Sequence, residues 1–182
     1  ASARAPLDEA QRWVAGVNLG DDAVLILCGF GLGHHIRALL RRVTGRCVLI
    51  VYDPGVALLR AVLERHDLTD IFASGVVRLV CHDEPGAISA AMERCEGLVA
   101  AGTLLIDHPA SHVRLGARAV SFPSTVAQVV MAVRTQVVTT LVQVETTVRN
   151  LLQNISWYAT CPGIADLKDA AKKWGQGEWG PG

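Results

Sequence analysis

The stretch that decides the fold is Val24-Leu-Ile-Leu-Cys-Gly-Phe-Gly-Leu-Gly-His-His-Ile-Arg-Ala-Leu-Leu40. A short apolar run is followed by glycines at alternate positions, Gly29, Gly31 and Gly33, and then by an amphipathic segment. This order predicts a buried strand, a tight glycine turn and the N-terminus of a helix. Glycine has no Cβ and tolerates positive φ, so such a turn lets a ligand approach the backbone, where free helical N–H groups face its acceptors. The stretch therefore predicts a fold of the nucleotide-binding type.

Apolar and amphipathic runs alternate on both sides of this turn. Further strands are expected at 47–52, 76–81 and 103–106, and helices at 7–17, 33–43, 56–65 and 85–95. The predicted fold class is therefore α/β, a Rossmann-like (methyltransferase-like) parallel sheet with helices on both faces. Right-handed crossovers place the glycine turn, Asp53, Asp83 and Asp107 along the carboxyl edge of that sheet.

From Ser124 onward, apolar residues recur at steps of three and four, which predicts one helix over 124–160 with Ser124 as its N-cap. Such a helix is longer than the sheet, so its far end should pack on a partner chain or a following domain. Cys161-Pro-Gly163 ends it. The expected organisation is a Rossmann-like domain over 1–123, a long amphipathic connecting helix over 124–160, and a short helix with a glycine-rich tail over 161–182. That tail would lead to a domain absent from this chain.

Composition narrows the classes of partner. Basic and acidic residues balance at 17 each, which gives no charge surplus for nucleic acid. No apolar run reaches the roughly 18–20 residues of a membrane helix, so no membrane association is expected. The five cysteines are far apart and form no CxxC pair, which favours buried free thiols in a reducing cytoplasm over zinc or disulfides. The chain also lacks an initiator Met and a signal peptide, so we expect a cytoplasmic fragment of a longer protein.

The glycine turn has the GxGxG spacing of methyltransferases that use S-adenosylmethionine, but Leu27 stands where those enzymes usually carry an acid. Asp53 lies at the expected end of the second strand, where a carboxylate can accept hydrogen bonds from both ribose hydroxyls. Asp53 is the best single candidate for ligand contact, although it could instead cap the following helix. Asp83 could reach a base from the end of the third strand, or cap the helix before Pro85. The cofactor-binding candidates are thus Gly29, Gly31, Gly33, Asp53 and Asp83.

Substrate-binding candidates lie beside the turn and after the fourth strand. His34 opens the first helix, where it could contact a phosphate or carboxylate or simply start the helix. Asp107 and His108 lie where methyltransferases often carry a catalytic loop, but neighbours in sequence need not face each other, so acid–base catalysis by this pair is a weak signal. No metal site is predicted, and no catalytic residue can be assigned.

The ordered set of motifs resembles the N-terminal domain of the motility-associated factor (Maf) family of flagellin glycosyltransferases, which carry an MptE-like domain. The resemblance covers about 21–171. It rests on Cys28-Gly-Phe-Gly-Leu-Gly-His-His-Ile-Arg-Ala-Leu-Leu40, Val51-Tyr-Asp-Pro54, Leu105-Ile-Asp-His-Pro109, the long helix into Asn150 and Asn154, and Cys161-Pro-Gly-Ile-Ala-Asp-Leu-Lys168.

The resemblance implies that an MptE-like transferase domain follows this chain and holds the sugar-nucleotide site. Related proteins transfer nonulosonic acids to flagellin, and the MptE branch instead pyrophosphorylates a pterin alcohol. By itself this chain should then transfer no sugar, and flagellin is a possible partner.

Three hypotheses remain from the sequence. The first is an accessory Rossmann-like domain of such a glycosyltransferase, with a nucleotide sugar as a possible ligand. The second is a small methyltransferase-like enzyme that binds S-adenosylmethionine. The third is a dimerisation or scaffold module that forms a homo-oligomer through the long helix.

Overall fold

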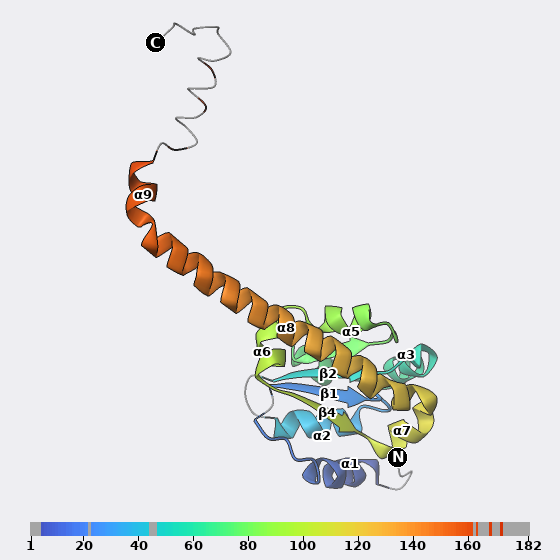
Figure 1. Cartoon of the computed structure of the whole chain (residues 1–182). Coiled ribbons are helices and arrows are strands. Elements are labelled where there is room, and N and C mark those ends of the chain that lie inside the picture. The colour runs from blue at the N-terminus through green and yellow to red at the C-terminus, as the bar shows by residue number, and fades with distance from the viewer. Residues whose placement is uncertain are drawn as a thin grey trace, which may run out of the picture. The chain divides into compact units, whose positions relative to one another are not determined.

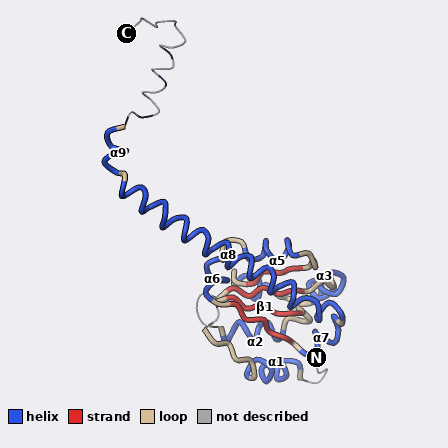
Figure 2. The backbone as a smooth tube through the Cα atoms, viewed as in Figure 1, coloured by secondary structure: helices blue, strands red, loops and turns tan. Residues whose placement is uncertain are grey.

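Four strands form one parallel sheet in the computed structural model, which describes residues 5–21, 23–43, 47–161, 163, 168 and 172. They are β1 (Val24–Cys28), β2 (Val48–Tyr52), β3 (Val77–Val80) and β4 (Thr103–Asp107), drawn in red in Figure 2. Their order in the sheet is β3-β2-β1-β4. The predicted parallel sheet is confirmed, and each strand agrees with its expected range to within one residue at either end. The order places β1, with the glycine turn at its end, at the centre between β2 and β4.

Helices cover both faces of the sheet, as predicted (Figure 1). One face packs against α1 (Pro6–Ala15), α2 (His34–Arg42), α3 (Val56–Arg65) and α4 (Thr69–Ala73). The other face packs against α5 (Pro85–Met92), α6 (Glu96–Ala101) and the first part of α8 (Ala117–Gln153). A short helix, α7 (Pro109–Leu115), follows the last strand.

The two hydrophobic cores follow from the alternation of side chains along β1. Val24, Ile26 and Cys28 point into the core beneath α5, α6 and α8, whereas Leu25 and Leu27 point into the core beneath α1 to α4. All five are at most 5% exposed, as expected for a parallel strand covered on both faces. Leu27, at the position where methyltransferases usually carry an acid, is therefore buried in the core.

The long helix begins earlier than predicted. α8 starts at Ala117 rather than at Ser124, and Pro123 lies inside it. Phe122 and Val126 are buried against the sheet, and the ring of Phe122 stacks on that of Tyr52 with centroids 4.0 Å apart. This packing outweighs the backbone hydrogen bond that proline cannot donate. The predicted single helix to residue 160 is also interrupted, because α9 (Ile155–Thr160) starts after Asn154.

The chain divides into two compact units, Ala1–Val138 and Thr139–Gly182. The first holds the whole sheet, and the second holds the rest of α8 and α9. Within the described residues, α8 is the helix long and apolar enough to cross a bilayer by length and composition, a test that core helices of soluble proteins also meet. The predicted short helix and tail over 161–182 lie almost entirely outside the described residues.

Candidate functional site

The glycine turn adopts the backbone conformation that its sequence predicts. Gly29, Gly31 and Gly33 have φ values of +100°, +52° and +79°, all in the region that favours glycine. A Cβ built on Gly29 would lie 2.2 Å from the Cβ and Oγ of Ser111 in α7. The close approach that glycine permits at this position is therefore used by a side chain of the same protein.

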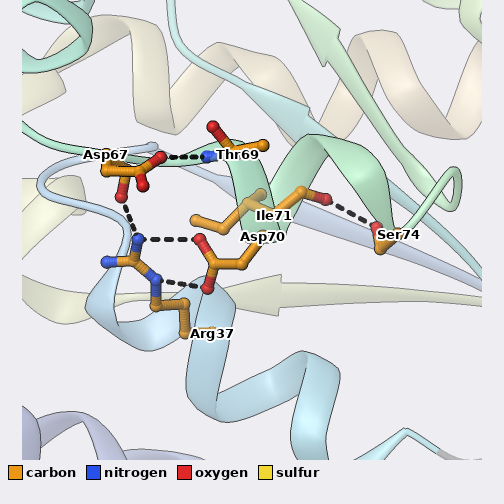
Figure 3. Close-up of polar contacts among 6 residues, drawn as sticks. All are labelled: Arg37, Asp67, Thr69, Asp70, Ile71 and Ser74. Carbon is orange, nitrogen blue, oxygen red and sulfur yellow. Dashed lines mark hydrogen bonds and ion pairs between the residues drawn. The ribbon is translucent and has the colours of Figure 1, made fainter.

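The far side of the turn is closed by α4. A Cβ on Gly33 would lie 3.0 Å from Cδ1 of Ile71. The guanidinium of Arg37 in α2 holds α4 in place with hydrogen bonds of 2.7 and 2.8 Å to the two carboxylate oxygens of Asp70, and it also binds the carbonyl of Asp67 (Figure 3). The hydrogen bond from Arg37 lowers the pKa of Asp70. Both ends of the glycine turn thus pack against helices of this chain.

Asp53, the leading candidate for ligand contact, is 1% exposed, and both its oxygens accept hydrogen bonds within the chain. Oδ2 accepts hydrogen bonds from the backbone N–H of Phe30 at 2.8 Å and from Nη2 of Arg114 at 2.5 Å. Oδ1 accepts the backbone N–H of Gly55 at 2.9 Å, which forms a turn before α3 rather than a cap on the helix. The carboxylate therefore ties the glycine turn, the end of β2 and α7 together. Contact of Asp53 with a ribose stays a prediction.

The buried ring of His35 stacks on the partly buried ring of His108 beside the turn. The rings of His35 and His108 are 4.1 Å apart and inclined by 4°, and the Trp13 ring meets both edge-on at 5.7 and 5.0 Å. Nε2 of His35 lies 3.0 Å from the carbonyl oxygen of Gly29, so this nitrogen carries the proton and donates it. Burial lowers the pKa of His35 to about 4, and it also lowers the pKa of His108. Both rings are neutral at pH 7, which removes charge repulsion from the stack.

His108 and Asp107 have separate partners. Nδ1 of His108 lies 2.8 Å from Oγ of Ser111, whereas the carboxylate of Asp107 lies 3.1 Å from Nδ1 of His112. The two neighbours therefore do not form an acid–base pair with each other. Ser111 is 3% exposed, which shields its hydroxyl from solvent.

Asp83 lies at the end of β3, away from the turn. Its carboxylate accepts a hydrogen bond from the hydroxyl of Tyr52 and lies 3.4 Å from Nε of Arg118 in α8. Burial, followed by the bond to Asp83, raises the pKa of Tyr52. These contacts tie β2, β3 and α8 together, and Asp83 itself remains about half exposed.

A cavity of about 210 Å³ lies over the glycine turn. It brings together three of the predicted residues, Gly31, His34 and His108, whereas Asp53, Asp83 and Asp107 do not line it. His34 is partly buried, burial lowers its pKa, and its Nδ1 has no hydrogen-bond partner. The full lining is Pro6, Glu9, Ala10, Gly31, Leu32, His34, His35, Leu58, His108, Ala110, Ser111 and Arg114. Its volume is smaller than the roughly 300–1,000 Å³ of most ligand pockets.

The cysteine thiols are the remaining reactive groups, and most of them are shielded from solvent. Cys28 ends β1 inside the core, and burial, with smaller contributions from Asp107 and Asp53, raises its thiol pKa to about 11. Such a thiol is a poor nucleophile at neutral pH. Three of the five cysteines are buried, as predicted, whereas Cys81 is partly buried and Cys161 is exposed. In the described part of the chain, no three His, Cys, Asp or Glu side chains come together as metal ligands.

Sequence reasoning missed the residues that close the turn, because it missed α7. Ser111 and Arg114 both lie in this helix. Two signals could have found it, since Pro109 is suited to the first turn of a helix and Gly116, with φ of +56°, ends it.

Comparison of the chain with family models, curated proteins and solved structures gave no match.

Proposed function

We propose that this chain is an accessory Rossmann-like domain of a motility-associated flagellin glycosyltransferase, and that it transfers no sugar by itself. The observation that carries the accessory role is the closed glycine turn. Gly29 packs against Ser111, so α7 of this chain occupies the place where a cofactor would approach the backbone. The family assignment rests on the motifs from Cys28 to Lys168 and is the part of the proposal that sequence resemblance supports.

The hydrogen bonds of Asp53 also support the accessory role. A carboxylate that holds both hydroxyls of a ribose needs two free acceptor sites, and three of the roughly four sites of Asp53 already accept from Phe30, Gly55 and Arg114. Release of Arg114 to admit a ligand would leave a buried carboxylate with fewer partners, which is costly. Asp53, the residue expected to bind a cofactor, therefore stabilises the fold instead.

In this proposal the domain acts in the cytoplasm beside an MptE-like transferase domain, and it contributes stability or contacts to partners such as flagellin. Reading the parent gene beyond the codon for Gly182 tests the family: an MptE-like domain should follow, and an unrelated domain there would contradict the assignment. Calorimetric titration of the purified chain with a CMP-linked nonulosonic acid, S-adenosylmethionine and NAD tests the accessory role. No binding heat is expected with any of the three.

A methyltransferase-like enzyme is the second candidate, favoured by a GxGxG turn in the left-handed conformation directly after the central strand. It predicts micromolar binding of S-adenosylmethionine that Asp53→Ala abolishes and that Asp83→Ala, at a half-exposed site away from the cavity, reduces less. Heat with S-adenosylmethionine alone would favour this candidate over the accessory domain. Heat with the CMP-sugar alone would keep the glycosyltransferase assignment and assign ligand binding to this domain.

A further inference from the structure

The second unit of the chain exposes many large apolar side chains. Nine of them lie between residues 141 and 158, and each is 48–66% exposed. They are Leu141, Val142, Val144, Val148, Leu151, Leu152, Ile155, Trp157 and Tyr158. Contiguous apolar surface of this kind marks an interaction site more often than a free surface.

Six of these residues follow one spacing. They succeed one another at steps of three, four, three, four and three, and we call them the heptad seam: Leu141, Val144, Val148, Leu151, Ile155 and Tyr158. This is the a/d pattern with which two helices pack knobs into holes. The backbone bonds from Asn154 N–H to the Asn150 carbonyl (3.1 Å) and from Tyr158 N–H to the Asn154 carbonyl (3.0 Å) bridge the interruption at Asn154 between α8 and α9.

The segment that carries the heptad seam has no net charge, which favours a partner segment that is also uncharged. Residues 139–160 contain one acid and one base, Glu145 and Arg149, and these pair with each other at 2.5 Å within the helix. The segment therefore has no net charge to repel an identical segment. Helices that lie on lipid surfaces usually carry several Lys or Arg residues on their polar face, and this one carries a single Arg.

We propose that the heptad seam binds a second copy of this chain and forms a two-stranded helical dimer. The seam is complementary to itself under a two-fold axis, as a symmetric dimer requires. In an antiparallel pairing, Val148 faces Leu151 of the other copy, and the same register also pairs Val144 with Ile155 and Leu141 with Tyr158. Each layer then places an apolar side chain against another, and this assignment does not depend on the glycosyltransferase proposal.

Light scattering over about 1 to 100 µM protein tests the dimer, because the mass of an associating chain depends on its concentration. The wild-type mass should rise from 19.4 kDa toward twice that value. Val148→Glu, in the middle of the seam, should raise the dissociation constant at least about tenfold. Thr146→Glu is the matched control, because it adds the same charge on the opposite side of the same helix, and its dissociation constant should stay within about twofold of wild type.

Both positions are exposed, so circular dichroism should show unchanged helix content in both variants. A mass that stays at 19.4 kDa over the whole range would overturn the proposal. A dimer that Val148→Glu leaves intact, or that Thr146→Glu weakens equally, would overturn it too. A monomer that sediments with anionic phosphatidylserine vesicles would also overturn it and assign the seam to lipid.

Discussion

Gly29→Ala is the substitution that tests the closed glycine turn most sharply. An alanine at this position destabilises the fold for two separate reasons, backbone strain and steric overlap. Gly29 has φ of +100°, a conformation that costs an L-residue about 1–3 kcal/mol. The Cβ would also lie 2.2 Å from the Cβ and Oγ of Ser111, and relief of such an overlap in a packed interior costs about 1–3 kcal/mol. We therefore expect Gly29→Ala to lower the free energy of unfolding by about 2–6 kcal/mol.

A double-mutant cycle separates these two costs. Ser111→Gly removes both overlapping atoms, so Gly29→Ala should cost about 1–3 kcal/mol less in that background than in the wild type. Gly75→Ala is the matched control: its φ is +69°, but no heavy atom lies within 4 Å of its Cβ position. Its cost should be the backbone strain alone, and Ser111→Gly should not change it.

Urea unfolding followed by circular dichroism measures all of these variants, provided that the denaturant slope stays constant. A cost of Gly29→Ala no larger than that of Gly75→Ala would refute the close packing of α7 on the turn. A coupling energy between Gly29→Ala and Ser111→Gly below about 0.5 kcal/mol would refute it as well.

Three further predictions concern the surrounding structure. Asp53→Ala should cost about 3–5 kcal/mol in the same unfolding assay, because it leaves Arg114 without its buried partner, whereas Asp83→Ala at a half-exposed ion pair should cost at most about 1 kcal/mol. Phe122→Ala should cost about 3–5 kcal/mol, and Val120→Ala at an exposed position of the same helix less than about 0.5 kcal/mol; equal costs would contradict the packing of α8 on the sheet. The depressed pKa of His35 means that the unfolded chain binds more protons between pH 6.5 and about 4, so stability should be full above pH 6.5 and fall by about 3 kcal/mol toward pH 4. His35→Gln should flatten this fall, and an unchanged pH profile in that variant would assign the fall to other groups.

The strands and most helices were predictable because their signals are local. An unbroken apolar run such as 48–52 is typical of a strand covered on both faces, and the glycines at 29, 31 and 33 predicted the turn. The start of α8 was predicted wrongly because Ser124 follows Pro123, a pattern that suggests a helix beginning. Burial of Phe122 in the core, which is a tertiary effect, continues the helix through that proline.

The candidate site was predictable only in part, because its contacts join residues far apart in the sequence. The sequence placed Asp53 at the end of the second strand, and it directly follows β2. Its ion-pair partner Arg114 lies 61 residues later, in a helix that the sequence analysis missed. Trp13, whose Nε1 donates to the Asp107 carbonyl at 3.3 Å, is 94 residues from that partner. Pairings at such separations leave no local pattern, so the closure of the turn was visible only in the fold.

The most direct test of the closed turn is the amide nitrogen-15 spectrum of the chain during titration with S-adenosylmethionine, NAD and a CMP-sugar, each to about 1 mM. The informative signals are the amides of Gly29, Phe30, Gly31 and Gly33, because they form the turn itself. If α7 and Asp53 close the turn, these signals should keep their positions with every ligand. Saturable shifts of Phe30 and the three glycines with any of the ligands would show an open cofactor site and contradict the account.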